Sequence, residues 1–158
     1  MMFTQTRTQD PFAARFGKEL PTGLREQAEG ISWATFSDTF APIADLRLRI
    51  TEVETLPGTL KNFHITILNN TEQGLQEEHH CIRSSGAAMA CTQLLADRGR
   101  RIEMLRFHQC QIFESTVTFI LAGNDIHTRW AMGFGGTPEQ SIAAALSTAG
   151  ELLYGSRS

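Results

Sequence analysis

The stretch WAMGFGGTPEQSIAAALSTAGELLY, residues 130–154, contains the strongest local pattern in the chain and decides the fold that we predict. Larger side chains occupy every second position from Ile126 to Phe134, which predicts a β-strand with one buried face. Gly135 and Gly136 then permit a tight turn, and residues 137–140 form a capping box with Thr137 at the cap and proline at the first helical position. The stretch therefore predicts a strand, a turn and a helix.

The helix that follows has one apolar stripe at helical spacing, formed by Ile142, Ala145, Leu146, Ala149 and Leu153. An apolar stripe of this length must be buried, and the sheet that contains the preceding strand is the closest surface. We therefore expect this helix to pack against that sheet.

The same order of elements is predicted twice. Residues 46–50, 63–67 and 75–81 have strand-like alternation, and a helix with a buried stripe from Ala87 to Leu95 follows them. Strands are next predicted at 102–113 and 116–121, before the strand and helix described above. We predict an α+β protein with two βββα units, an internal duplication of architecture.

The duplicated domain is expected to span residues 43–158, behind an arm with linker-like helices at residues 1–42. We expect a frayed arm or one short helix before Lys18, and Trp33, Phe36 and Phe40 at helical spacing before Pro42. A three-stranded sheet with one helix is marginal alone, so we expect the two units to pack together. An open sheet face or edge would then favour a homodimer.

Composition excludes several classes of function. The chain has 158 residues, 41% of them hydrophobic, and a formal charge of −3 with no basic stripe, so no direct nucleic-acid binding is expected. No apolar run approaches the ~18 residues of a membrane span, and the N-terminus lacks the pattern of a secretion signal. We expect a soluble cytoplasmic protein.

Few residues form a pattern typical of catalysis or metal binding. His79 and Cys81 would share one face of a strand, but two ligands do not complete a zinc site, so we predict no metal, no cofactor and no catalytic residues. Two turns are different, because a small-residue turn before a helix leaves backbone N–H groups free for a carboxylate. These are residues 83–87 and 133–137, which together could form a cleft for an amino acid or a small organic acid, or could serve only as helix caps.

In order and spacing, residues 20–154 resemble the C-terminal allosteric and dimerisation domain of 2-isopropylmalate synthase and its homocitrate and citramalate synthase relatives. Residues 20–24 and 31–42 are similar to the linker after the catalytic barrel, and Ser85-Gly86-Ala87-Ala88 stands where the family has an Asn-Gly-Pro turn. Residues 93–99 resemble the end of the next helix, Trp130-Ala131-Met132-Gly133-Phe134 the family's Trp-Gly-Val-Gly-Ile strand, and residues 141–147 its last helix.

The resemblance implies two βββα units, a dimer and a leucine-type effector. It implies contacts with the charged end of that effector from Ser84, Ser85, Gly86 and Ala87, and with its side chain from Met104, Phe107, Gln111 and Phe134. The chain departs from the family at four of these positions, and the amide of Gln111 in a pocket for an isobutyl group argues against leucine itself. The synthase barrel and its metal-binding residues have no counterpart, so we expect no enzyme activity.

Three hypotheses of function follow. The first is a non-catalytic, homodimeric regulatory protein that senses an amino acid, a keto acid or a related metabolite, or binds a partner protein. The second is a redox-responsive regulator of a partner such as a transcription factor, in which two of Cys81, Cys91 and Cys110 would meet across the helix–sheet layer. The third is an accessory subunit for a separate synthase barrel.

Overall fold

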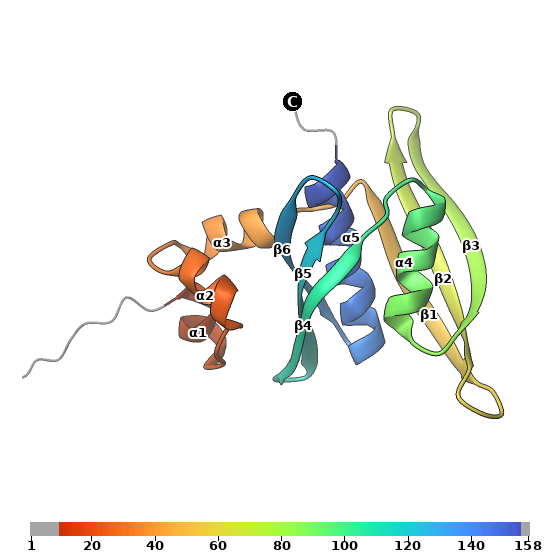
Figure 1. Ribbon diagram of the computed structural model, residues 1–158, viewed down its shortest axis with the longest axis horizontal. Helices are drawn as coiled ribbons and strands as arrows, with labels where there is room; N and C mark the ends of the chain where they lie inside the picture. The colour runs from red at the N-terminus through yellow and green to blue at the C-terminus, as the bar shows by residue number, and fades with distance from the viewer. Residues whose placement is uncertain (1–9, 156–158) are drawn as a thin grey trace, which may run out of the picture.

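The computed structural model describes residues 10–155 of the chain. Three short helices come first, followed by two rounds of three strands and a helix (Figure 1). The elements are α1 (Pro11–Phe16), α2 (Thr22–Ala28), α3 (Trp33–Phe40), β1 (Leu46–Thr55), β2 (Lys61–Thr71), β3 (Gly74–Ser84), α4 (Ala87–Asp97), β4 (Glu103–Ile112), β5 (Ser115–Gly123), β6 (Thr128–Gly135) and α5 (Pro138–Tyr154).

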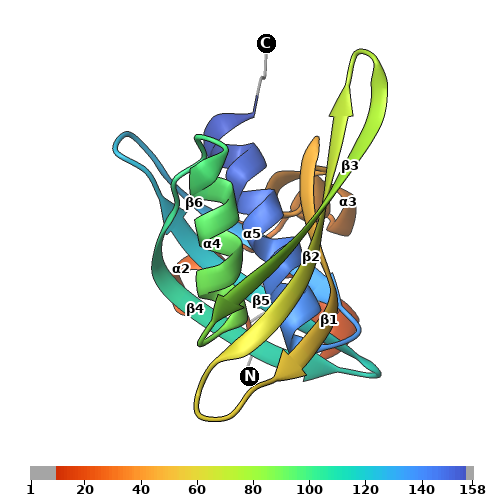
Figure 2. The ribbon, with the colours of Figure 1, turned by 90° about the vertical axis from the view of Figure 1, so that its right-hand side faces the viewer.

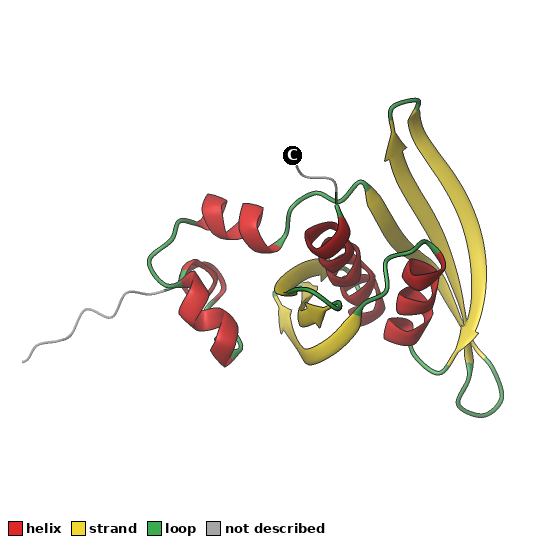
Figure 3. Ribbon diagram, turned by 45° about the horizontal axis from the view of Figure 1, so that its top comes forward, coloured by secondary structure: helices red, strands yellow, loops and turns green. Residues whose placement is uncertain are grey.

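The strands form two separate antiparallel sheets, in the orders β1-β2-β3 and β4-β5-β6. Each sheet is a meander that leads directly into a helix, as the colouring by secondary structure shows (Figure 3). The predicted fold class, α+β with two βββα units behind a helical arm, is confirmed.

Helices α4 and α5 lie between the two sheets and share one core with them (Figure 1). Residues from both sheets, such as Ile65 of β2 and Ile120 of β5, are fully buried there beside Leu95 and Leu146 of the helices. A buried hydrogen bond also joins the units, because the Leu48 amide on β1 donates to Ser147 Oγ on α5 over 2.8 Å. The expected packing of one unit against the other is therefore present.

Strand β6 is buried on both faces, so the predicted single buried face is wrong. Trp130 and Met132 point toward the N-terminal helices, while Ala131 and Gly133 point toward α5. Helix α5 packs on the face of β6 that has the small residues, because the helix backbone lies very close to the strand. A Cβ added at Gly133 would lie 2.1 Å from the backbone nitrogen of Ala145, so only glycine fits.

The N-terminal helices cover the other face of the second sheet and form a second core with it. Phe12 of α1 and Phe36 of α3 are fully buried against this sheet, and the ring centroids of Phe12 and Phe119 are 5.1 Å apart. The aromatic residues of the arm thus cover a surface of the domain behind it. The short helix expected before Lys18 is α1, and residues 1–9 of the predicted frayed segment lie outside the described residues.

The first sheet keeps one face open. Its inner face is in the core, and its outer face, turned away from the helices, has no element over it among residues 10–155 (Figure 2). Strand β3 forms one edge of this sheet and is exposed along nearly its whole length. None of the helices in the described part of the chain is long and apolar enough to cross a membrane.

Candidate functional site

The turn between β3 and α4 provides no side-chain cap for the helix that follows it. The N-cap of α4 is Gly86 and has no side-chain cap, and the neighbouring Ser85 directs its hydroxyl to the Met89 sulfur. Ser84 Oγ instead closes the turn locally by donating to the Gly86 carbonyl over 3.2 Å. Helices α4 and α5 begin at the same end of the molecule, so the two small-residue turns do lie at one end (Figures 1 and 2).

The residues expected around the side chain of an effector do not share one face. Phe107 on β4 lies opposite Ile120, a residue of the core around α5, and Gln111 follows on the same side. Phe134 lies opposite Val117 of the second core, and its ring centroid is 6.0 Å from that of Phe16 on α1. Met104 joins Phe107 on the helix side. The second sheet therefore separates Phe134 from the other three residues.

The three cysteines are free thiols in three different layers. Cys81 is exposed on the outer face of the first sheet, opposite His64, whereas Cys91 is fully buried in the core between the sheets. Cys110 packs against the core under the N-terminal helices. Burial raises the pKa of Cys91 to about 12 and also raises that of Cys110, so the thiolate form is disfavoured at both.

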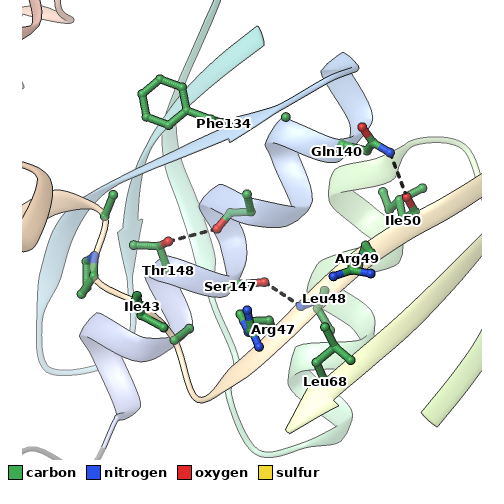
Figure 4. Close-up of a pocket in the computed structure, with 15 residues that line it drawn as sticks. Ile43, Arg47, Leu48, Arg49, Ile50, Leu68, Phe134, Gln140, Ser147 and Thr148 are labelled. Carbon is green, nitrogen blue, oxygen red and sulfur yellow. Dashed lines mark hydrogen bonds between the residues drawn. The ribbon is translucent and has the colours of Figure 1, made fainter. Parts of the chain in front are cut away.

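A cavity of about 470 Å³ lies where β1, α5 and the end of β6 approach one another (Figure 4). Its other wall is the connection from the arm, residues 41–44. This volume is within the range of ~300 to 1,000 Å³ that is typical of small-molecule sites. Phe134 and Gly135, at the end of β6, line the cavity, whereas no residue of the turn at 84–87 does.

The only charged residues in this lining are two arginines, Arg47 and Arg49 of β1. Among the described residues, neither forms a salt bridge with a carboxylate, and Arg47 Nε is buried without a hydrogen-bond partner. A buried guanidinium N–H without a partner is unfavourable, and carboxylates and phosphates can accept hydrogen bonds from such a group in a bidentate manner. The two arginines therefore give this side of the cavity a positive charge, which favours the binding of an anion.

The rest of the lining is apolar or already hydrogen-bonded. Ser147 Oγ accepts from Leu48 and donates to the Ala143 carbonyl, and Thr148 Oγ1 donates to the Ala144 carbonyl. Gln140 Nε2 donates to the Ile50 carbonyl over 3.4 Å (Figure 4). The free binding capacity thus comes from the arginines at one side and from apolar side chains that include Leu48, Leu68 and Ile43. This arrangement suits a small acid with an apolar chain.

Sequence reasoning did not find this site. Arg47 and Arg49 alternate with Leu46, Leu48 and Ile50, which indicates an ordinary half-buried strand. Their role depends on β1 being an edge strand beside α5, a placement that no local pattern contains. The sequence offered one indication of an anion site. Arg47 and Arg49 lie two residues apart, and Asp45 is the single acidic residue between Ala44 and Ile50.

No protein-family model matches the chain, and no curated protein matches it significantly.

Proposed function

We propose that this chain is a non-catalytic regulatory protein that binds a small carboxylate metabolite in the cavity between β1, β6 and α5. The observation that carries the proposal is the pair Arg47 and Arg49, which line the cavity while no acidic residue does. A ligand carboxylate would supply the missing partner for the buried Arg47 Nε. The lining also has no His, Cys, Asp or Glu, the usual general acids and bases.

The lining favours a keto acid over an amino acid. An α-ammonium group needs a carboxylate or several carbonyl oxygens, and here it would instead approach two guanidinium groups. A 2-oxo acid has no such group and keeps the carboxylate. The apolar side chains of Leu48, Leu68 and Ile43 suit a branched aliphatic chain, which would be removed from water on binding.

The position of the cavity supports a regulatory role. Residues 41–44 connect the arm to β1 and form one wall, while α5 and β6 belong to the second unit. A bound acid would contact the connection, the first sheet and the last helix at once. Its binding energy would favour one arrangement of these parts over others, which is how a ligand shifts a conformational equilibrium.

We further propose that the protein acts as a homodimer in the cytoplasm, or through a partner protein. The support is the edge strand β4, where Met104 and Phe107 face the helix side of the sheet yet remain 37% and 47% exposed. Helix α5 packs mainly against β5 and β6 and hydrogen-bonds to β4 at Gln109, while Met104 and Phe107 on the same strand stay partly exposed. A second copy could cover these apolar side chains and pair with the strand edge.

Thermal unfolding of the full chain tests the ligand proposal. We expect 4-methyl-2-oxopentanoate to stabilise the protein, L-leucine to do so less, and 4-methyl-2-pentanone, which lacks the carboxylate, to have no effect. At a ligand concentration of 100 times Kd the stabilisation is about 2.7 kcal/mol, or roughly 5 to 11 °C in Tm.

Variants then locate the effect. Arg47→Gln and Arg49→Gln should each raise the Kd for 4-methyl-2-oxopentanoate at least about tenfold, because each removes a charged hydrogen-bond donor. The matched control Arg106→Gln on exposed β4 should leave the Kd unchanged. No response to branched, straight-chain or aromatic 2-oxo acids would contradict the proposal. An equal response in the Arg47 and Arg106 variants would show that this cavity is not the site.

A further inference from the structure

The outer face of the first sheet gathers side chains that bind metals. The inner-facing residues Phe63 and Ile65 of β2 are in the core, so His64 between them points outward. Strand β1 contributes Glu52 and Glu54 to the same face, since Val53 between them packs against the core. None of these three residues belongs to the cavity with the two arginines.

A β-bulge creates this juxtaposition. The register of β1 and β2 shifts between Ile50 and Glu52, so Thr51 has no partner and Glu52 lies directly opposite His64. With regular pairing, Thr51 would take that place. Bulges often redirect side chains in this way, and here the bulge exchanges a hydroxyl for a carboxylate beside the imidazole.

The distances are close to those of a metal site. One ligand atom from each of Glu52, Glu54 and His64 lies within 4.8 Å of the other two, and His64 Nε2 is 2.7 Å from Glu54 Oε1. Ligands at ~2.0 to 2.2 Å around a tetrahedral zinc ion lie about 3.4 Å apart. Glu52 and Glu54 are exposed, so small rotations of their side chains would close the difference.

Charge and a fourth donor point to the type of ion. Two carboxylates beside one imidazole have a charge of −2 when the imidazole is neutral, and neither pairs with a lysine or arginine of the described chain. Cys81 lies directly opposite His64 on β3 and lines one shallow groove with His64 and Glu52, but its sulfur lies outside the 4.8 Å cluster of the other three ligand atoms. A nitrogen, a thiolate and carboxylate oxygens together are the donors that Zn²⁺ prefers over Mg²⁺ or Ca²⁺.

We propose that Glu52, Glu54 and His64 bind one Zn²⁺ ion on the outer face of the β1-β2-β3 sheet, and that Cys81, whose sulfur lies outside this cluster, moves toward the ion and becomes the fourth ligand through its thiolate. Each of the three strands then contributes to the site, and the ion links both edge strands to the centre of the sheet. This site is independent of the proposed carboxylate cavity. The sequence pattern pointed only to His79 and Cys81, because Glu52 and His64 become neighbours only through the pairing of β1 with β2 and the bulge in β1.

Calorimetric titration with ZnCl₂ tests this site in the full, untagged chain after treatment with a chelator. We expect one Zn²⁺ per chain, and a Kd at least about tenfold weaker in His64→Gln and in Glu54→Gln, since even indirect changes at zinc sites cost 10-fold or more. His127→Gln and Glu114→Gln are matched controls in exposed turns and should bind as the wild type does.

Cobalt(II) reports on the fourth ligand. The Co²⁺-loaded wild type should show a thiolate charge-transfer band in the near ultraviolet, and Cys81→Ser should lose it. Absence of stoichiometric Zn²⁺ binding, or unchanged binding in both His64→Gln and Glu54→Gln, would overturn the site. A charge-transfer band that persists in Cys81→Ser would overturn the assignment of the thiolate.

Discussion

Replacing Gly133 with alanine should destabilise the protein far more than the added methyl group suggests. The new Cβ would lie 2.1 Å from Ala145 N, 2.6 Å from Ala144 C and 2.7 Å from Ala145 Cα, all of them backbone atoms of α5. Carbon and nitrogen atoms in contact are normally ~3.5 Å apart, so helix and strand must separate by about 1.4 Å. No side-chain rotation can relieve this contact.

The cost follows from what α5 buries. Its residues Ala143, Ala145, Leu146 and Ala149 are at most 1% exposed, and the helix contacts both sheets, so a shift opens the core on two sides. Overpacking usually costs 1 to 3 kcal/mol, and a backbone clash belongs at the upper end, about 3 kcal/mol or more. For a chain of this size that corresponds to a fall in Tm of roughly 6 to 12 °C.

Urea unfolding followed by circular dichroism measures this difference. The control is Gly136→Ala in the same turn, where the nearest atom to a new Cβ is Gln140 Oε1 at 3.2 Å, the end of a flexible side chain. We expect a change of about 0.5 kcal/mol or less for the control. A loss below about 1 kcal/mol in Gly133→Ala would refute the close packing of α5 on β6.

Three further predictions concern stability and thiol reactivity. Ser147→Ala should lower the free energy of unfolding in urea by about 1 to 3 kcal/mol, because it leaves the buried Leu48 amide on β1 without an acceptor. The control Thr148→Ala should lower it less, because the Thr148 hydroxyl bonds only within α5, and equal losses would contradict this account. Thr137→Ala should cost about 1 kcal/mol by removing the cap on the Gln140 amide, and an unchanged midpoint would argue against that cap. At pH 8 a thiol reagent should label exposed Cys81 rapidly and Cys91, with its pKa raised to about 12 by burial, only after unfolding; rapid labelling of Cys91 would show that the core opens.

The sequence predicted the elements well where a pattern is local. Thr137 accepts a hydrogen bond from the Gln140 amide over 3.1 Å, and Pro138 begins the helix, as the capping box indicates. The buried stripe of α4, from Ala87 to Leu95, was also visible from spacing alone. Such features depend on residues within one or two turns of each other, so they can be recognised without the fold.

Features that depend on two distant segments were not predictable in the same way. Alternation in β6 identified a strand, but it could not show that the arm would bury Trp130 while α5 buried Ala131. Arg47 lies on the edge strand beside α5, and His64 is beside Glu52 only because of a bulge. The effector residues taken from the family resemblance were likewise separated by a sheet, since Phe134 and Phe107 lie on its two faces.

The most direct test of the proposed carboxylate cavity is to see which backbone and side-chain resonances respond to the ligand. A ¹H–¹⁵N NMR titration of the assigned protein with 4-methyl-2-oxopentanoate should move the amides of residues 43–50 and 140–148 and the Nε–H of Arg47, whose nitrogen is buried without a partner. Changes confined to residues 84–87 and 104–111, or no changes at all, would contradict the account.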